Sequence, residues 1–489
     1  MRHTRTLGWL VTALALALAP RPAAAQAPHP EDTSSVTRHS IRIGGQAVNY
    51  TATAGTYWMQ DDKGKNVASL FYVYYTRDDV ADRAARPLFI SFNGGPGSSS
   101  VWMHMGFTGP RRVVYDEDGF MLRPPYRLED NQYSILDIAD IVYIDPAATG
   151  YSRMVEGQDA HKYHGVMEDI QSVGDFIQAF VTRNRRWDSP KFVIGESYGT
   201  TRASGLAGYL QTNHRMYLNG VILVSMTGLD VEKGVDVGFA TGLPHYTATA
   251  WYHKALPADL QAKPLRAVLD EAEPFAMGPY LSALVKGHDL PDAERDQVAS
   301  AVARITGLSA DYVKRADLRV GRERFRKELL RSRGLTVGRL DSRYTGLDRD
   351  EAGETYDFDP AMESWNGPFA GVVNTYLRDE LKYETDLTYN IFGPVNPWNR
   401  SGTVNVGEML RGAMARNPFL RVMILEGYYD GATDYFGAEY TIGHLDPGGQ
   451  LKDRFTWGFY ECGHMMYIKN SELAKTKKDL AAFVQAASR

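Results

Sequence analysis

Cysteine is almost absent from this sequence, since Cys462 is the only one among 489 residues. A single thiol cannot form a disulfide within the chain, so the fold has to be held by a hydrophobic core, which a chain of this length can supply. Long hydrophobic runs are also missing beyond the first residues, because no later segment has 18 uninterrupted apolar residues. That excludes an ordinary membrane-spanning helix in that part of the chain.

An excess of basic residues is missing as well. The formal net charge is -5 and no basic cluster interrupts the chain, so nucleic acid is not an expected partner. His161 and His164 are spaced three residues apart, but no H-E-x-x-H motif or cysteine pair accompanies them. We therefore expect no metal and no cofactor. The oligomeric state cannot be read from these features.

The N-terminal segment "MRHTRTLGWLVTALALALAPRPAAAQAP" has the pattern of a secretory signal peptide. Arg2 and Arg5 precede an apolar run at 7–19, and small residues follow up to Ala25, where cleavage is expected. Its 13 apolar residues are fewer than the roughly 20 that a spanning helix needs, although an N-terminal anchor is the alternative interpretation.

Cleavage predicts an exported protein, periplasmic or secreted, with no stable membrane association. It would remove three arginines and no acid, which takes the net charge from -5 to -8.

Short apolar runs alternate with helical patterns along the rest of the chain. Between 161 and 184, apolar residues recur at three- and four-residue spacing, which predicts a helix with one apolar face. This alternation predicts an α/β fold with a mostly parallel central sheet flanked by helices. The predicted buried strands are 87–92, 140–145, 191–195, 220–225 and 421–427.

Two regions depart from this alternation of strand and helix patterns. Alternating residues and turn glycines at 40–76 predict an antiparallel hairpin at the edge of the sheet. The strand signal then nearly vanishes from 230 to 389, which predicts a mainly helical insertion, or cap, with a polar loop at 341–360. The predicted organisation is a signal peptide at 1–25, a first core part at 26–229, the insertion at 230–389 and a second core part at 390–489, ending in a helix at 472–487.

The stretch "KFVIGESYGTTRA" places a serine between two glycines after a strand and before a helix. Gly195, Ser197 and Gly199 form the pattern G-x-S-x-G, which in this context is a nucleophile elbow. A serine hydroxyl is a poor nucleophile at neutral pH and needs a base. Ser197 is therefore a candidate catalytic nucleophile, and an ordinary turn is the alternative.

An acid and a base in the α/β-hydrolase order follow further along the chain. Asp430 lies just beyond a predicted strand in "MILEGYYDGATD", and His464 follows a turn glycine in "FTWGFYECGHMMY". In this reading His464 takes the proton of Ser197, and Asp430 orients the imidazole. Asp434 is the other candidate acid, and His444 the other candidate base.

Acyl transfer also needs donors for the oxyanion. The loop "FNGGPGSSS" follows a predicted strand, and its glycine-rich backbone can present N–H groups. The α/β-hydrolase pattern predicts Gly95 and Tyr198 as the two donors. A phosphate-binding loop is the alternative, but the lysine of the P-loop motif is missing.

Together "FNGGPGSSS", "YIDPAATGYS", "GESYGT", "GYYDGATD" and "CGHMMY" resemble the serine carboxypeptidase family, in the family's order. The resemblance implies an α/β-hydrolase with a helical insertion, a Ser197–Asp430–His464 triad, and peptide substrates with a free C-terminus. It also implies that Asn93 and Glu196 bind the substrate's terminal carboxylate. The carboxylates of Glu196 and of the substrate would lie at hydrogen-bond distance and must then share a proton. Substrate binding should therefore strengthen on the acid side of neutrality.

The sequence departs from the family at three positions. Ser91 stands where the family has a tryptophan, Phe107 where it has a second glutamate, and Ser98 where it has a cysteine. The favoured function is an exported serine carboxypeptidase. A serine esterase, amidase or acyltransferase with the same triad is the alternative, because it would not need strict recognition of a free carboxylate. A binding protein that has lost the chemistry is a third hypothesis.

Overall fold

The computed structural model describes residues 33–488 apart from positions 62, 160, 161, 230, 232 and 400–403. The predicted signal segment, 1–25, and His161 lie outside the described residues. None of the described helices is both long and apolar enough to cross a membrane. The signal peptide and its alternative, an N-terminal anchor, therefore both stay predictions.

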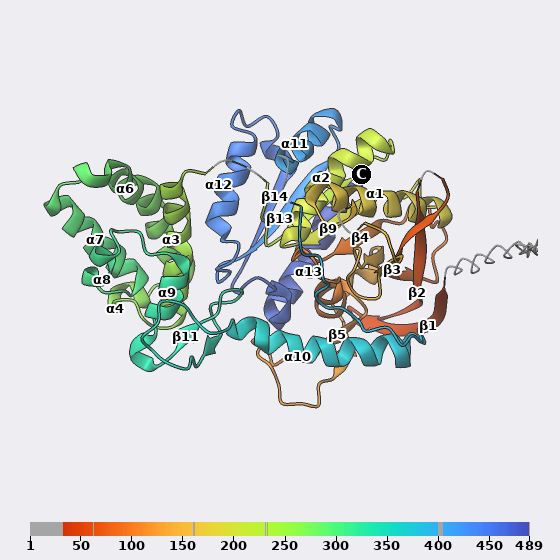
Figure 1. Ribbon diagram of the computed structural model, residues 1–489, viewed down its shortest axis with the longest axis horizontal. Helices are drawn as coiled ribbons and strands as arrows, with labels where there is room; N and C mark the ends of the chain where they lie inside the picture. Colours follow the sequence, from red (N-terminus) through yellow and green to blue (C-terminus); the bar gives the residue numbers. More distant parts are fainter. Residues whose placement is uncertain are drawn as a thin grey trace, which may run out of the picture. The chain divides into compact units, whose positions relative to one another are not determined.

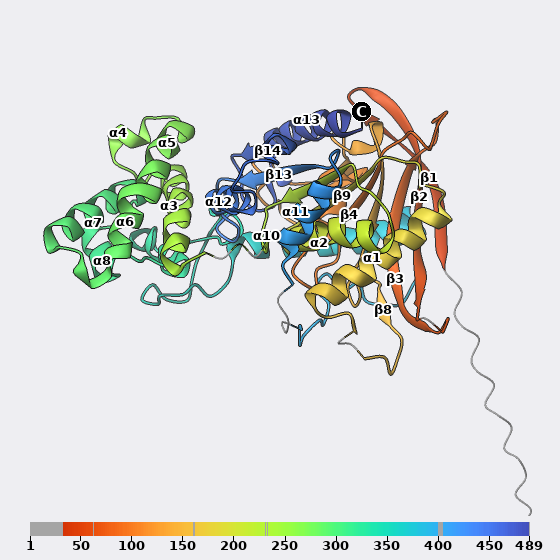
Figure 2. The same ribbon diagram turned by 90° about the horizontal axis from the view of Figure 1, so that it is seen from above.

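A mixed central sheet carries the site (Figures 1 and 2). Its strand order is β1-β2-β3-β7-β4-β9-β10-β13-β14, and β8 pairs with β3. The strands are β1 Ser34–Ile43, β2 Gln46–Gln60, β3 Asn66–Arg77, β4 Leu88–Phe92, β7 Asp140–Ile144, β8 Arg153–Met154, β9 Lys191–Glu196, β10 Gly220–Val224, β13 Arg421–Gly427 and β14 Phe455–Tyr460. Two small ribbons lie outside it, β5 Arg111–Val113 with β6 Leu128–Asp130 and β11 Thr336–Val337 with β12 Thr345–Gly346.

The strands from β7 to β14 run parallel to one another. In β4, β7, β9 and β10 every residue is buried, as expected for parallel strands that are covered on both faces. The five strands predicted from apolar runs are all present, with ends shifted by at most one residue. The predicted α/β architecture is therefore confirmed.

The antiparallel edge is longer than the sequence predicted. It begins at Ser34 rather than near residue 40, and β1, β2 and β3 form a three-stranded meander. β3 then pairs antiparallel with β7, which joins the meander to the parallel strands. Burial alternates along β1 and β2, because one face of this ribbon meets the core and the other does not.

Helices cover both faces of the sheet (Figure 2). Alternate strand residues enter two separate apolar clusters, so Ile90 and Val193 pack with one set of helices and Phe89 and Phe192 with the other. The first set is α1 Val166–Arg183, α2 Tyr198–Asn213, α11 Val406–Arg416 and α12 Tyr435–Leu445, and the second is α10 Pro360–Thr375 and α13 Asn470–Ala487. The predicted helices at 161–184 and 472–487 correspond to α1 and α13.

Seven helices between β10 and β11 build a second core of their own. They are α3 Val235–Tyr252, α4 Ala258–Gln261, α5 Leu265–Phe275, α6 Leu281–Lys286, α7 Asp292–Thr306, α8 Ala310–Arg315 and α9 Arg322–Glu328. The region that the sequence marks as an insertion is thus mainly helical. Its last helix, α10, packs into the core beneath the sheet through Trp365 and Phe369. The domain boundaries themselves stay predictions.

The predicted polar loop at 341–360 begins with four buried residues and contains the short strand β12. Asp341, Ser342, Arg343 and Tyr344 are all buried. The Arg343 guanidinium lies 2.6 Å from Asp341, so each charge satisfies the other away from water. Composition alone could not show this burial, because a paired buried charge is indistinguishable in sequence from a solvated one.

A buried charge cluster stabilises the end of the sheet opposite the strand ends that carry Ser197. Asp140, at the start of β7, is fully buried and contacts Arg86 at 2.6 Å and Arg186 at 2.7 Å. Arg186 also donates to the hydroxyl of Tyr74 at 2.6 Å. Removing one partner of such a cluster leaves uncompensated buried charge.

We predict that Asp140→Asn lowers the free energy of unfolding by about 3–5 kcal/mol, because two arginines lose their counter-charge. Chemical denaturation measures the change. The control is Arg315→Gln, which breaks an exposed ion pair with Asp311 and should change stability by less than about 1 kcal/mol. Equal, small effects of both substitutions would contradict a structural role for the cluster.

Candidate active site

Ser197 lies on a sharp turn between β9 and α2. Its backbone has φ 58° and ψ -128°, a sparsely populated region that costs about 1–3 kcal/mol. The flanking glycines are required by space, because a Cβ on Gly195 would lie 2.1 Å from the carbonyl oxygen of Gly199. The predicted strand, turn and helix are therefore present, and the strained turn holds the serine at the end of the strand.

The loop after β4 lies directly against this turn. β4 and β9 are parallel neighbours in which Phe92 pairs with Gly195, so the next residues, Asn93 and Glu196, emerge side by side. A Cβ on Gly94 would lie 2.4 Å from the Tyr198 nitrogen, so the approach needs glycine there.

A further hydrogen bond fixes the packing of the loop after β4 against the turn at Ser197. Arg202 of α2 donates from Nη1 to the carbonyl of Asn93 at 2.7 Å. Gly95, which follows in the loop, has φ 103° and lines the same cavity as Ser197.

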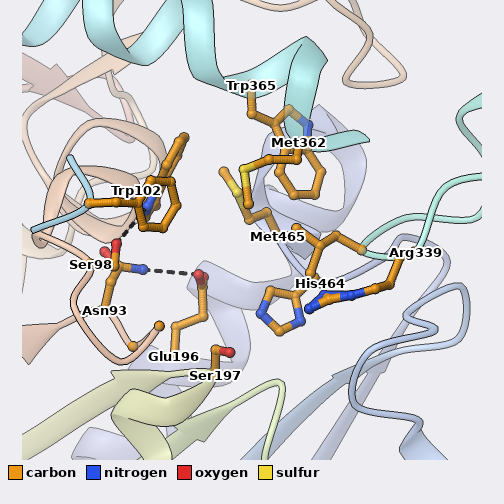
Figure 3. A pocket seen from close by; sticks show the side chains of 14 residues that line it. Asn93, Ser98, Trp102, Glu196, Ser197, Arg339, Met362, Trp365, His464 and Met465 are labelled. Carbon is orange, nitrogen blue, oxygen red and sulfur yellow. Dashed lines mark hydrogen bonds between the residues drawn. The ribbon is translucent and has the colours of Figure 1, made fainter. Parts of the chain in front are cut away.

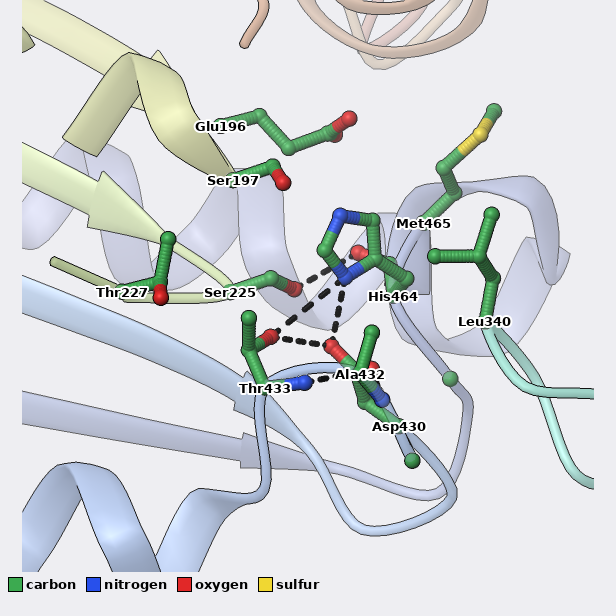
Figure 4. A network of polar contacts seen from close by, with 12 residues as sticks. Glu196, Ser197, Ser225, Thr227, Leu340, Asp430, Ala432, Thr433, His464 and Met465 are labelled. Atoms are coloured by element: carbon green, nitrogen blue, oxygen red, sulfur yellow. Dashed lines mark hydrogen bonds and ion pairs between the residues drawn. The ribbon is translucent and has the colours of Figure 1, made fainter. Parts of the chain in front are cut away.

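Asp430 and His464 come from the loops after β13 and β14 and meet beside Ser197 (Figure 4). The Nδ1 atom of His464 lies 2.6 Å from Oδ2 of the fully buried Asp430. Thr433, which the sequence analysis did not single out, donates to Asp430 from its hydroxyl at 2.5 Å and from its N–H at 3.1 Å. The Ser197 hydroxyl points toward the other side of the imidazole.

Electrostatics favour a charged Asp430 next to a basic imidazole. Burial alone would raise the pKa of Asp430, but the His464 charge and the hydrogen bonds from His464 and Thr433 hold the pKa below its ordinary value. Burial alone would lower the pKa of His464, but the Asp430 carboxylate raises it above the ordinary value. Because Nδ1 is committed to Asp430, Nε2 is left as the proton acceptor.

The alternative acid and base lie elsewhere. Asp434 caps α12 by accepting from the N–H of Gly437 at 2.7 Å, and it pairs with Arg322. His444 is exposed, and its ring contacts the carbonyl of Tyr440 at 2.7 Å. Neither residue lines the cavity of Ser197.

A cavity of about 170 Å³ opens above Ser197 (Figure 3). Polar groups lie at its base and apolar side chains form much of its wall. It is lined by Asn93, Gly94, Gly95, Ser98, Trp102, Glu196, Ser197, Arg339, Leu340, Met362, Trp365, Phe392, His464 and Met465. A small, partly apolar cavity that contains a serine, an imidazole and a carboxyl group is suited to acyl transfer on a short substrate end.

Asn93 and Glu196 are hydrogen-bonded to each other, with Nδ2 of Asn93 2.9 Å from Oε1 of Glu196. Asn93 Oδ1 accepts from the N–H of Met103, at the start of the π-helical turn η1 Met103–Thr108, at 2.9 Å. Burial raises the pKa of Glu196 to about 7. The pair is thus pre-positioned, and Glu196 carries a proton over part of the neutral range.

Tyr467 is a partner of Glu196 that the sequence analysis missed. Its hydroxyl donates to Oε2 of Glu196, and its ring stacks on Phe107 with centroids 4.7 Å apart. Phe107 occupies the place where the family has a second glutamate, so here a phenol supplies a contact to Glu196 next to that position. The final tyrosine of "CGHMMY" was quoted in the sequence, but no local pattern shows that it faces residue 196.

The segment 339–343 was also missed, although it contacts both catalytic loops. The N–H of His464 donates to the carbonyl of Leu340 at 2.7 Å, and the N–H of Gly463 donates to Asp341 at 3.1 Å. On the other loop, the N–H of Gly431 donates to the carbonyl of Arg339 at 2.9 Å. This part of the predicted insertion therefore braces the loops of Asp430 and His464.

Comparisons with known proteins find similarity in sequence over part of the chain and in fold over most of it. A family model described as serine carboxypeptidase matches residues 45–261, which include Asn93 and Ser197 but end before Asp430. Serine carboxypeptidase S10 family member 2 of Dictyostelium discoideum is 28% identical over 166 residues, 34% of this chain and 28% of that protein. Pheromone-processing carboxypeptidase KEX1 of Saccharomyces cerevisiae is 30% identical over 145 residues, 28% of this chain and 19% of that protein. The matched segments thus span about a third or less of these relatives.

The fold comparison extends over more of the chain. The crystal structure of Kex1(Δ)p, a prohormone-processing carboxypeptidase from Saccharomyces cerevisiae, aligns with a TM-score of 0.56 at 15% identity, over 89% of this chain and 91% of that one. The predicted α/β-hydrolase fold is confirmed. The chain is thus similar in sequence to serine carboxypeptidases over residues 45–261, and it shares the fold of one of them over most of its length.

Proposed function

We propose that this protein is an exported serine-type carboxypeptidase that releases C-terminal amino acids from peptides. The observation that carries the proposal is one cavity that holds Ser197, His464 and the hydrogen-bonded pair of Asn93 and Glu196. A nucleophile with its base and a pre-positioned group for a carboxylate are the two requirements of this reaction. Export is inferred from the N-terminal sequence alone.

In the proposed reaction Ser197 attacks the carbonyl carbon of the last peptide bond while its hydroxyl proton passes to Nε2 of His464. The C–N bond then breaks, and His464 gives that proton to the nitrogen of the leaving amino acid. Water, deprotonated by His464, then attacks the acyl carbon. The ester bond to Ser197 breaks, His464 returns the proton to the serine oxygen, and the shortened peptide leaves. Asp430 stays ionised and stabilises the imidazolium, which its low pKa supports.

The N–H groups of Gly95 and Tyr198 are the proposed donors to the oxyanion. This proposal is supported by the close contact between the loop of Gly95 and the turn of Tyr198. Gly94 lies so close to the Tyr198 nitrogen that no Cβ would fit. Donors on rigid backbone need no reorganisation when charge develops on the substrate oxygen.

Asn93 and protonated Glu196 are proposed to bind the terminal carboxylate of the substrate. A neutral carboxyl can donate to a carboxylate, whereas an ionised one repels it. Tyr467 holds the far oxygen of Glu196, so the near oxygen stays directed at Asn93 and the cavity. The substrate class that follows is peptides with a free C-terminus.

We predict that Ser197→Ala lowers kcat by at least about 10⁴-fold, because it removes the hydroxyl beside His464 that is proposed to form the acyl-enzyme. Hydrolysis of N-blocked dipeptides measures the effect. The matched control is Ser204→Ala, which removes a buried hydroxyl from the same helix α2 outside the cavity and should leave kcat unchanged. A Ser197→Ala variant that works at the wild-type rate would end the assignment.

A second prediction concerns the free carboxylate. The kcat/KM for an N-blocked dipeptide should exceed that for its C-terminal amide by about 10–100-fold, the usual range for hydrogen bonds to a charged group. Asn93→Ala should bring this ratio close to one, mainly through KM for the free acid. The amide, measured with both proteins, shows whether the catalytic groups remain intact. Equal values for acid and amide, with faster turnover of simple esters, would support the esterase or amidase alternative.

A third prediction is a pH dependence of binding. The pKa of Glu196 is raised to about 7, so the group is protonated below that pH and loses its proton as pH rises through it. KM for a free-acid peptide should therefore rise about tenfold between about pH 6 and pH 8. KM for the amide should not show this rise.

The neutral isostere Glu196→Gln is the matched variant for this test. Its amide donates at every pH, so KM for the free acid should become independent of pH between the same limits. An unchanged pH profile in Glu196→Gln would show that another group binds the carboxylate.

A further inference from the structure

Arg339 is a cationic group in the wall of the catalytic cavity. The residues around it are largely apolar, with Met362 and Trp365 from α10 and Leu340 next in the chain. Figure 3 shows its guanidinium beside the His464 ring, on the side away from Asn93 and Glu196. The proposed catalytic steps and the proposed grip on the terminal carboxylate leave this charge without a function.

The backbone of Arg339 is fixed on both sides. Its N–H donates to Oδ1 of Asp359 at 3.0 Å, and its carbonyl accepts from Gly431 at 2.9 Å. The next residue, Leu340, holds the N–H of His464 through its carbonyl. The backbone of Arg339 is therefore held by hydrogen bonds to both catalytic loops, and its guanidinium extends from this fixed segment to the side of the His464 ring.

No carboxylate neutralises this charge among the residues that the structure describes. Asp359 is nearby, but its oxygens accept from the backbone N–H groups of Arg339, Leu340 and Ala361. Other arginines of the helical region do have counter-charges: Arg319 with Asp236, Arg322 with Asp434, Arg326 with Glu323, Arg331 with Glu328 and Arg343 with Asp341. A half-buried arginine without such a partner, inside a cavity, is a site for an external anion.

The position selects which part of a substrate meets Arg339. In the proposed function the terminal carboxylate lies at Asn93 and Glu196, so the leaving residue occupies that side of Ser197. The acyl residue lies on the other side, where Arg339 is. This inference rests on the proposed function for the direction of the peptide.

We propose that Arg339 makes the enzyme prefer peptides with an acidic side chain, Glu or Asp, on the acyl side of the scissile bond. A guanidinium binds a carboxylate through two parallel N–H···O bonds, and the apolar wall of Met362 and Trp365 strengthens that attraction by excluding water. The same charge disfavours Lys or Arg at this substrate position.

The test compares N-blocked Glu-Phe with N-blocked Gln-Phe, an isosteric pair, at about pH 6, where the glutamate side chain is ionised and Glu196 is protonated. The wild-type protein should prefer Glu by at least about tenfold in kcat/KM. Arg339→Gln should bring the ratio of the two kcat/KM values close to one, because any change in the basicity of His464 affects the Glu and Gln substrates alike. Arg339→Glu should reverse the preference, so that a Lys-Phe substrate becomes better than Gln-Phe.

Two controls separate this effect from general ones. Arg349→Gln removes the same charge from an exposed position, where the side chain is 89% accessible, and should leave the Glu preference intact. The pair Ala-Glu and Ala-Gln moves the charge to the leaving residue and should show no dependence on Arg339.

Three results would overturn the proposal: a wild-type ratio of one or below, an equal loss for Glu and Gln substrates in Arg339→Gln, or an effect confined to the leaving residue. An equal loss would mean that Arg339 binds the terminal carboxylate or supports the loops. Blocked Glu and Gln ethyl esters keep the test independent of the proposed function. If no dipeptide is cleaved but the esters show the Arg339-dependent Glu preference, the carboxypeptidase proposal fails and the acidic acyl subsite stands.

Discussion

The contact on which the site depends is the one between the loop after β4 and the turn after β9. Two parallel strands in register deliver Asn93 and Glu196 as neighbours, and the absence of a side chain at Gly94 lets one backbone touch the other. A single methyl group at residue 94 would push the loop away from Tyr198 and separate the proposed oxyanion donors. Strand register, a glycine and the strained backbone of Ser197 thus act together to build half of the cavity floor.

The other half is held from the helical region. The segment 339–343 accepts from His464 and Gly431 and pairs Asp341 with Gly463, so it contacts the loops that bring the acid and the base. The buried ion pair of Asp341 and Arg343 fixes this segment in turn. A region that looks like an addition to the α/β core is therefore part of what holds Asp430 and His464 together, and it also supplies Arg339 to the cavity.

Local sequence signals were sufficient for the core strands, for the elbow and for the residues that converge beside it. Each is encoded over a few positions: apolar runs for the strands, two glycines around Ser197, and strand ends before Asp430 and His464. The roles of these residues stay predictions until the variants are measured. Tyr467, Arg339 and Asp341 could not be found in this way, because their importance arises from partners more than 100 positions away, at Glu196, His464 and Gly463. Nothing within their own neighbourhoods distinguishes them from surface residues.

Glu196 and Arg339, which line opposite sides of the cavity, shift the pKa of His464 in opposite directions. A Glu196 carboxylate raises the pKa of the imidazole, and the Arg339 guanidinium lowers it. In the proposed complex a terminal carboxylate keeps Glu196 protonated, which removes the first influence, and an acidic acyl residue neutralises Arg339, which removes the second. The basicity of His464 in the complex is then set mainly by Asp430, which is itself fully buried and is held by Thr433. When a peptide places a carboxylate at both Glu196 and Arg339, the pKa of His464 is set by the protein alone. When it places none at either, both side chains shift that pKa.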